Sequence, residues 1–460
     1  MAATQKMFDC IVVGGGFTGL AAAAELVRAG KSVVVVERDT ALGGLAGGFD
    51  VGGIELEKFY HHWFTSDTHI TGIADQIGRR DRVVTRPTRT GMYFSGNFFR
   101  LSTPMDLLRF TAIPFFDRIR TGLATLAVRR VKDWKKLEDI SATDWLIANF
   151  GKTAYRVVWE PLLVGKFGSY AKDISAVWFW NKLALRGGSR GKGGGEELAY
   201  YSGGFAQLAR DIGEYIEKNG GVVLLGKSAK AVREAGGIVE VETDTGVLHG
   251  HSSLVTTPLP YAAEMFAPAT GQGYADKLNR IKYLGNVCLV LEMTHSLSEI
   301  YWLNVNDPTF PFVGIIEHTN FESKEAYGGR HIVYLSKYLP VEDALYCMTS
   351  EELFEYSLPY IQRMFPAFDP AWVTQHHTWR ALYAQPLVEK HYSDLIPPFE
   401  TPVNHVFLST MAQVYPEDRG TNYAVREGKK AAERIVAHLA SSKPAALAAD
   451  PDAAPKKSVA

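Results

Sequence analysis

The chain opens with an apolar run and an alanine-rich stretch that predict a strand followed by a helix. Residues 8–13 are almost continuously apolar, as in a strand buried on both faces, and small residues up to Val27 favour a helix. A second apolar run at residues 31–37 predicts another strand beside the first. We therefore expect a complete β-α-β unit at the start of the chain.

The remainder of the chain alternates between helical and strand-like patterns. Helical periodicity is found in residues 104–137, 140–185, 203–218, 350–364 and 421–439. Strand-like patterns are found in residues 54–64, 222–255, 286–293, 311–336 and 405–410. Residues 187–195 form a Gly-rich break, and the tail at 441–460 is rich in Ala and Pro and is expected to be disordered.

The loop after the first strand carries a spaced set of glycines. Gly14, Gly16 and Gly19 fit the pattern G-x-G-x-x-G, with Phe17 and Thr18 between the last two. The first glycine permits a tight turn, the second lets the backbone approach a pyrophosphate, and the third allows close packing of helix on strand. This context predicts a dinucleotide-binding site, with a Gly-rich turn that binds no ligand as the alternative.

Two features near this motif bear on which dinucleotide is bound. Glu37 ends the second strand, where a carboxylate can accept hydrogen bonds from an adenosine ribose. A second glycine patch begins at Gly43 and Gly44, where a longer ligand would need more close approach to the backbone. These features favour FAD, with NAD as the rival.

A glycine-bearing loop also precedes the last predicted helix. Gly420, Thr421, Asn422 and Ala424 lie where that helix is expected to begin. A helix N-terminus aimed at a flavin pyrimidine would stabilise the negative charge that develops on reduction. An ordinary helix cap after a turn accounts for the pattern equally well, so both interpretations stay open.

These patterns together indicate an α/β fold with an α+β substrate part. We expect a Rossmann-like FAD-binding domain that is assembled from separated segments and interleaved with a substrate domain of mixed sheet and helices. The expected FAD-binding domain comprises residues 1–90, 196–260 and 396–440. The expected substrate domain comprises residues 91–195 and 261–395.

Composition limits the possible partners and locations. A net charge of −1 with 22% charged residues gives no reason to expect a nucleic-acid partner. Cys10, Cys288 and Cys347 have neither metal-ligand nor disulfide spacing, so we expect no metal and a reducing compartment. Because no apolar run is long enough to span a bilayer, we expect a cytoplasmic protein.

One segment keeps a peripheral membrane contact open. Residues 104–137 mix apolar side chains such as Leu107, Phe115 and Phe116 with several arginines, as interfacial helices do. A substrate-domain helix with a basic face is the alternative. If the membrane contact holds, a lipid-linked substrate becomes plausible, and the protein is cytoplasmic but membrane-associated.

Four stretches in the same order as a known superfamily support the FAD prediction. They are residues 11–48, which include Glu37-Arg38 and Gly43-Gly44, and residues 159–168, 201–205 and 407–432. In these stretches the chain resembles the superfamily of monoamine oxidase, protoporphyrinogen oxidase and phytoene desaturase. The resemblance implies a substrate domain lying over FAD and adds Arg38 to the cofactor-binding residues. No cysteine lies in residues 407–432, so we expect non-covalent FAD.

Residues 60–67 (YHHWFTSD) and 93–101 (YFSGNFFRL) are similar to stretches of UDP-galactopyranose mutase. The likeness implies that His62 is the histidine near the flavin, and Thr65 stands where that family has a second histidine. Strand alternation would place His61 and His62 on opposite faces, so at most one could address the flavin. A core histidine is the alternative for His62.

Three further polar residues are candidates for catalysis. Glu317 and His318 follow the apolar run 311–316, and strand ends deliver side chains to pockets, so either could remove a substrate proton. A polar hairpin turn is the alternative. Arg380 could bind an anionic substrate group, or could form a surface ion pair.

The basic residues at the Gly-rich break are Arg186, Arg190 and Lys192. These residues could form a mobile lid that binds an anion, or the segment could be a solvated linker.

The leading hypothesis is an FAD-dependent oxidoreductase that oxidises or desaturates a small organic substrate by hydride transfer to flavin N5. A lipid-linked or sugar-linked substrate is included in this hypothesis. One alternative is a redox-neutral flavin mutase or isomerase acting on a sugar nucleotide or an isoprenoid. Another is a non-enzymatic carrier of prenylated proteins, of the Rab escort type. The glycines and Glu37 disfavour the carrier, because a protein that binds no FAD does not need them.

Overall fold

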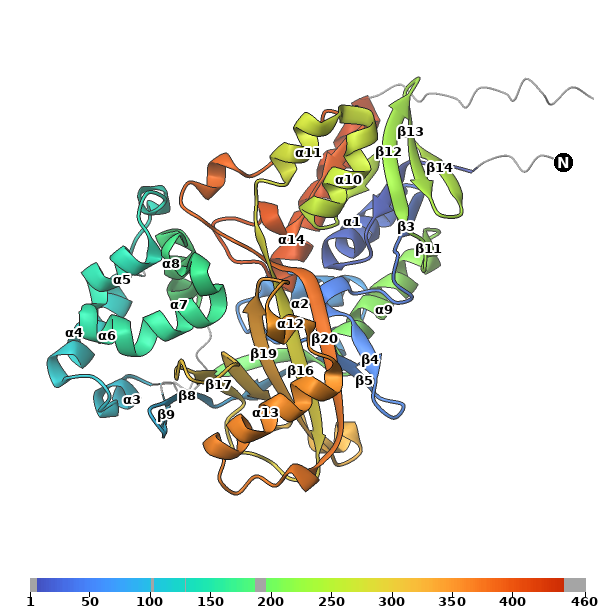
Figure 1. Cartoon of the computed structure of the whole chain (residues 1–460). Coiled ribbons are helices and arrows are strands. Elements are labelled where there is room, and N and C mark those ends of the chain that lie inside the picture. Colours follow the sequence, from blue (N-terminus) through green and yellow to red (C-terminus); the bar gives the residue numbers. More distant parts are fainter. Residues whose placement is uncertain (1–5, 101–102, 129, 187–195, 442–460) are drawn as a thin grey trace, which may run out of the picture.

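The computed structural model describes residues 6–100, 103–128, 130–186 and 196–441, and it is built around two large sheets (Figure 1). Two sequence expectations lie outside the described residues. These are the Gly-rich break with Arg190 and Lys192, and the tail beyond residue 441, and the side chain of Arg186 lies outside them as well.

A five-stranded parallel sheet, with strands from the beginning, middle and end of the chain, forms the core of one half of the protein. Its strands lie in the order β11 (Val222–Leu224), β3 (Val33–Val36), β2 (Cys10–Val13), β15 (Ser253–Val255) and β21 (Val406–Leu408). The strands β2, β3, β15 and β21 are buried throughout, which explains their continuous apolar runs. Helix α1 (Phe17–Arg28) packs against α14 (Thr421–Ser441) and α9 (Gly204–Lys218). The expected β-α-β unit is thus present.

A second sheet joins this core. It consists of β1 (Met7–Phe8), β14 (Gly246–Gly250), β13 (Ile238–Thr243) and β12 (Ala229–Ala235). Helix α10 (Leu259–Thr270) packs on β12 and on α11 (Gln272–Leu278). Because these helices lie beside β12 in Figure 1, residues 261–278 belong with the parallel-sheet half, although the sequence assigned them to the substrate domain.

A mixed seven-stranded sheet forms the other half. Its strands lie in the order β20 (Val373–Pro386), β16 (Tyr283–Met293), β19 (His331–Leu339), β18 (Gly314–Glu317), β17 (Trp302–Val305), β8 (Thr90–Phe94) and β9 (Asn97–Arg100). All neighbours are antiparallel except β17 and β8. Helices α12 (Ala344–Cys347) and α13 (Ser350–Met364) pack against β16, and α13 also packs against β20.

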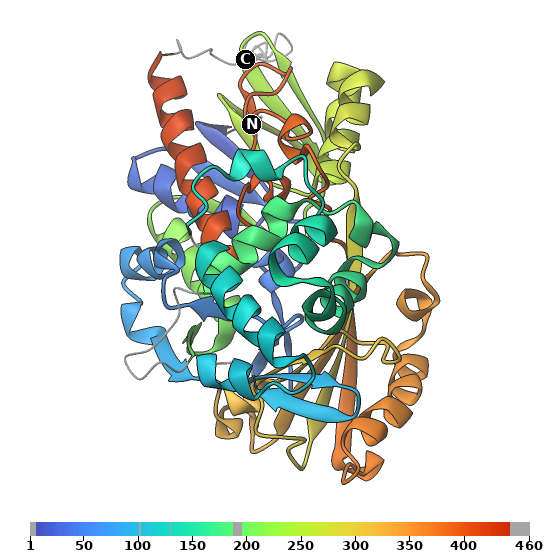
Figure 2. The ribbon, with the colours of Figure 1, turned by 90° about the vertical axis from the view of Figure 1, so that its left-hand side faces the viewer.

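A group of helices lies on the other side of the molecule and faces the viewer in Figure 2. It comprises α3 (Pro104–Arg109), α4 (Phe115–Val128), α5 (Ala142–Phe150), α6 (Lys152–Ala154), α7 (Glu160–Phe167) and α8 (Ala176–Arg186). A π-helical turn at Tyr155–Trp159 joins α6 to α7, and α7 packs against β19 and β17 of the large sheet. The helix group and the seven-stranded sheet together form the second half of the protein.

The strand expected at residues 54–64 is interrupted. Strand β5 (Glu55–Glu57) pairs with β4 (Gly48–Asp50), whereas β6 (Trp63–Phe64) joins β10 (Glu197–Tyr201) and β7 (Val83–Pro87) in a separate sheet. Residues 58–62 between them are irregular, and helix α2 (Thr68–Gln76) follows. Strand alternation therefore does not govern His61 and His62, because their segment borders a cavity and pairs with no strand.

Candidate active site

The glycine motif forms the turn between β2 and α1. Gly16 is the N-cap of α1 and no side chain caps the helix, so its first N–H groups are available to a ligand. A Cβ on Gly16 would meet no atom within 4 Å, which leaves room for a pyrophosphate at this point. A Cβ on Gly19 would lie 2.0 Å from the carbonyl oxygen of Gly14, so Gly19 serves packing between the helix and the turn.

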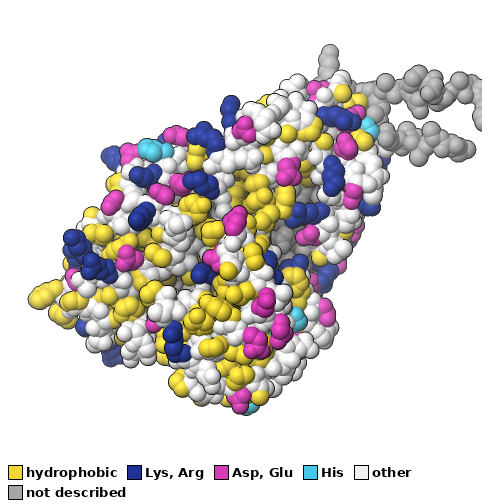
Figure 3. Space-filling model, in the orientation of Figure 1, with side chains coloured by type: hydrophobic (Ala, Val, Ile, Leu, Met, Phe, Trp, Pro, Cys, Tyr) yellow, Lys and Arg dark blue, Asp and Glu magenta, His cyan; other side chains and the backbone are white. Residues whose placement is uncertain are grey.

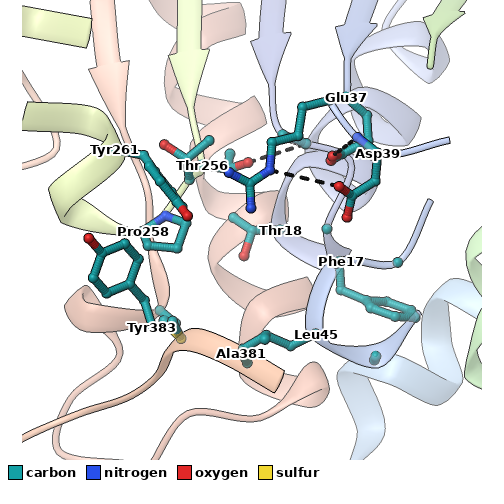
Figure 4. A pocket seen from close by; sticks show the side chains of 18 of the residues that line it. Phe17, Thr18, Glu37, Asp39, Leu45, Thr256, Pro258, Tyr261, Ala381 and Tyr383 are labelled. Atoms are coloured by element: carbon teal, nitrogen blue, oxygen red, sulfur yellow. Dashed lines mark hydrogen bonds and ion pairs between the residues drawn. The ribbon is translucent and has the colours of Figure 1, made fainter. Parts of the chain in front are cut away.

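A cavity of about 720 Å³ lies over this turn and gathers residues from distant parts of the chain. The predicted cofactor residues that line it are Gly14, Gly16, Phe17, Thr18, Glu37, Arg38, Gly43, Gly44, Gly420, Thr421 and Ala424. Figure 4 shows Glu37 and Asp39 across the cavity from Tyr261 and Tyr383. We call it the dinucleotide cavity.

Glu37 is held by backbone donors at the edge of this cavity. Its Oε2 accepts a hydrogen bond from the N–H of Gly15 at 2.6 Å, and its Oε1 accepts one from Asp39 at 2.9 Å. Burial raises the pKa of the Glu37 carboxyl despite these two donors. Beside it, the guanidinium of Arg38 stacks over the ring of Tyr261 at 4.5 Å. Sequence patterns did not indicate Tyr261.

A second cavity of about 380 Å³ adjoins the first and is richer in aromatic side chains, including Tyr60, Trp159, Trp178 and Trp302. We call it the aromatic cavity. The two cavities share seven lining residues: Leu45, Phe59, His61, Ala381, Arg419, Gly420 and Thr421. The start of α14 therefore lies at the junction of the two cavities.

The two neighbouring histidines have different surroundings. His61 lines both cavities, its Nδ1 lies 2.6 Å from the carbonyl oxygen of Phe59, and burial lowers its pKa to about 4, so the ring is neutral at pH 7. His62 lines only the aromatic cavity, and its Nδ1 lies 3.0 Å from the hydroxyl of Tyr301. The sequence analysis favoured His62 as the histidine near the flavin, but His61 is the histidine that lies at the junction of the two cavities.

Charged side chains from three elements meet in the aromatic cavity. Lys182 Nζ on α8 lies 2.6 Å from Asp418 Oδ2, and Lys166 Nζ on α7 lies 3.8 Å from the same oxygen. Arg419 donates a hydrogen bond to the hydroxyl of Tyr338 at 2.7 Å. Burial, with the nearby cations, lowers the pKa of Lys166 to about 7. Sequence reasoning missed Lys182 and Asp418, although Asp418 directly precedes the Gly420 junction.

Two of the residues that were predicted to be catalytic lie outside both cavities. Glu317 and His318 are buried but line neither cavity. Glu317 accepts hydrogen bonds from the Ser296 hydroxyl and the Ser298 N–H, and His318 Nε2 lies 2.6 Å from the Tyr327 hydroxyl. His318 therefore closes the turn between β18 and β19, as in the alternative interpretation, and Glu317 binds the loop between β16 and β17.

Arg380 and Asn422 have local partners. Arg380 lines the dinucleotide cavity, but its Nε donates to the carbonyl oxygen of Tyr346 and another guanidinium nitrogen donates to that of Met348. The side-chain oxygen of Asn422 accepts from the N–H groups of His69 and Ile70, so it caps the start of α2. Asn422 lines the aromatic cavity and not the dinucleotide cavity, where it was expected.

An uncapped helix N-terminus beside open space at Gly16, next to a cavity lined by aromatic side chains, is the arrangement expected of an enzyme that uses a dinucleotide. The family model of flavin-containing amine oxidoreductases matches residues 17–436, so the chain belongs to that family. It is therefore an FAD-dependent oxidoreductase.

Individual relatives are distant. Cyclohexylamine oxidase from Brevibacterium oxydans IH-35A is 18% identical and superposes with a TM-score of 0.70 over 95% of this chain and 100% of that chain. Putrescine oxidase bound to putrescine is also 18% identical, with a TM-score of 0.67 over 94% and 99%. These likenesses show a shared fold. Carotenoid phi-ring synthase of Streptomyces griseus is 28% identical over 186 residues, and the chain spans 36% of its length.

Proposed function

We propose that this protein oxidises or desaturates a small organic substrate in the aromatic cavity while FAD lies in the dinucleotide cavity. The observation that carries the proposal is the junction of the two cavities at His61, Ala381 and the start of α14. Residues that line both cavities, including Gly420 and Thr421 at the start of α14, would hold the flavin ring beside the substrate. When bound, FAD supplies hydride acceptance at N5.

The protein's own residues would position and shield the reactants. The N-terminus of α1 would bind the pyrophosphate, and Glu37 the ribose. The positive end of α14 would favour negative charge on the flavin pyrimidine. Trp63 supports that end, because its indole N–H donates to the Thr421 hydroxyl at 3.1 Å. The aromatic side chains would exclude water. Neutral His61 donates its Nδ1–H to the carbonyl oxygen of Phe59, so its Nε2 would offer a hydrogen-bond acceptor at the junction.

The first experiment is to purify the protein, record its flavin absorption, reduce it chemically without oxygen and mix it with aerated buffer. A spectrum that returns quickly supports an oxidase, and one that stays reduced for minutes supports a dehydrogenase or a desaturase. Acid precipitation should release the flavin, because we expect non-covalent FAD. A protein purified without flavin that also fails to bind added FAD would contradict the proposal.

A slow return would also fit the redox-neutral mutase or isomerase. The mass of the product distinguishes an oxidation from such a redox-neutral reaction. A product two hydrogens lighter than its substrate supports oxidation, and a product of unchanged mass supports isomerisation. A protein that binds prenylated partners but no FAD would support the carrier.

We also propose that the helix group touches a membrane surface through residues 104–137. Figure 3 shows apolar side chains projecting at the edge where α4 lies in Figure 1. Four of them form one face of α4 and are exposed: Phe116, Ile119, Leu123 and Leu126. The segment has eight basic and three acidic residues, which suits an anionic lipid surface. Among the described residues, no helix is long and apolar enough to cross a bilayer.

A further inference from the structure

The aromatic cavity contains a cluster of charges that is positive overall. Lys166 on α7, Lys182 on α8 and Arg419 before α14 surround one carboxylate, that of Asp418. Asp418 is already shared, because Gln385 Nε2 donates to its Oδ1 at 3.2 Å and Lys182 binds its Oδ2. Because Lys166 has a pKa of about 7 and is only partly protonated at pH 7, the three basic side chains leave an excess of between one and two positive charges around Asp418.

The positions of Lys166 and Arg419 are fixed by their surroundings. Lys166 Nζ lies 4.7 Å from the ring centroid of Trp178 and 5.0 Å from that of Tyr338. Arg419 donates to Tyr338, while its Nε is buried without a hydrogen-bond partner among the described residues. Lys182 is 40% exposed, whereas Lys166 is largely buried. Burying Lys166 and Arg419 beside a single carboxylate costs free energy, which a ligand anion would offset.

The other carboxylates of the cavity are engaged elsewhere. Asp67 Oδ2 accepts a hydrogen bond from the N–H of Phe64 at 3.0 Å, and Glu196 accepts one from the Thr90 hydroxyl at 2.5 Å. Among the described residues, neither Asp67 nor Glu196 forms an ion pair with Lys166, Lys182 or Arg419, so Asp418 is the carboxylate that the two lysines share.

We propose that Lys166, Lys182 and Arg419 form an anion subsite, so that the substrate carries a carboxylate or a phosphate which they hold while its reacting carbon faces the flavin. This inference rests on the proposed function, because it needs FAD in the neighbouring cavity. Lys166 and Lys182 line only the aromatic cavity, which separates their role from cofactor binding. A cluster of this kind would reject a protonated amine by charge repulsion.

The test uses the FAD-loaded protein and small aromatic probes of matched shape. Benzoate, its uncharged analogue benzamide and the cation benzylamine are titrated, and the dissociation constants are read from perturbation of the flavin absorption. We expect benzoate to bind at least tenfold more tightly than benzamide, and benzylamine to bind least. Phenyl phosphate is titrated in the same way. Tighter binding than benzoate would identify the anionic group of the substrate as a phosphate, and weaker binding would identify it as a carboxylate.

Two variants test whether the lysines of the aromatic cavity cause the preference for benzoate. Lys182→Met should reduce the preference for benzoate over benzamide about tenfold, whereas Lys277→Met, an exposed lysine on α11 away from both cavities, should leave it unchanged. If the Lys182 variant does not fold, the three probes on the wild-type protein still decide. Equal binding of benzoate and benzamide to a flavin-containing protein would overturn the anion subsite alone. Absence of flavin would overturn the proposed function.

Discussion

Two glycines of the same motif act differently, and substitutions can separate them. A side chain at Gly16 would enter open space where the pyrophosphate is expected, whereas a Cβ at Gly19 would collide with backbone. We predict that Gly16→Val weakens FAD binding at least tenfold and leaves the unfolding midpoint of the FAD-free protein near the wild-type value. Gly19→Ala should lower that midpoint, because overpacking costs about 1–3 kcal/mol. FAD titration and thermal unfolding measure both, and the converse pattern would contradict these roles.

Glu317 offers a pH-dependent prediction. Burial raises its pKa from 4.5 to about 7, so the folded protein holds a proton that the unfolded chain releases above pH 4.5. The stability from this proton is complete below pH 4.5 and is lost as pH rises to about 7, by an amount on the order of a few kcal/mol. Glu317→Gln should therefore gain stability relative to wild type between pH 5 and pH 8.

Denaturant unfolding at both pH values measures this difference. The same variant checks the placement of Glu317 outside the active site, because flavin reduction by substrate should proceed at the wild-type rate. A large loss of reduction rate in a folded variant would return Glu317 to a catalytic role. A constant stability difference across the pH range would show that the carboxyl titrates normally.

The cofactor residues could be predicted from the sequence because each lies in a contiguous motif with fixed backbone roles. Most of the predicted positions line the dinucleotide cavity. The aromatic cavity could not be predicted, because Lys166, Lys182 and Asp418 meet only through the packing of α7, α8 and the loop before α14. Glu317 and His318 were predicted to face a pocket but line neither cavity, because a polar strand end has the same sequence pattern whether it closes a turn or faces a pocket.

At the scale of elements, the parallel core was the most predictable part, since strands buried on both faces give continuous apolar runs. Strand β20 was not predicted, because its first half is partly exposed and polar and carries no clear alternation. The segment 54–64 was predicted as one strand, but it splits because residues 58–62 border the cavities. In each case the error arises where burial is set by contacts distant in sequence.

The exposed face of α4 carries a prediction at this scale. Phe116 is 81% exposed and Leu123 is 63% exposed, on the same side of the helix. We predict that Phe116→Ser with Leu123→Ser reduces sedimentation with vesicles of phosphatidylcholine and phosphatidylserine at least tenfold, because each buried side chain contributes about 1.5–3 kcal/mol. Leu225→Ser, exposed in the other half, is the control. Wild-type protein that stays in the supernatant would refute the membrane contact.

At the scale of the whole molecule, the dinucleotide cavity connects segments that are far apart in the chain. It is lined by the first β-α-β unit, by the end of β15 near Thr256, by β20 at Ala381 and by the start of α14. A ligand that touches all four holds both halves of the protein together. Removal of FAD should therefore destabilise both halves together and lower the midpoint temperature of a single cooperative unfolding transition.

We predict that protein stripped of FAD unfolds at a lower temperature, and that added FAD raises the midpoint continuously with concentration. Binding to the folded state alone stabilises by RT ln(1 + [FAD]/Kd), about 2.7 kcal/mol at one hundred times Kd. Calorimetry at a series of FAD concentrations measures this dependence. Gly16→Val should follow the same curve displaced to higher FAD concentrations, because its loss is in affinity. Two separate transitions, only one of them FAD-dependent, would show instead that FAD stabilises a single half.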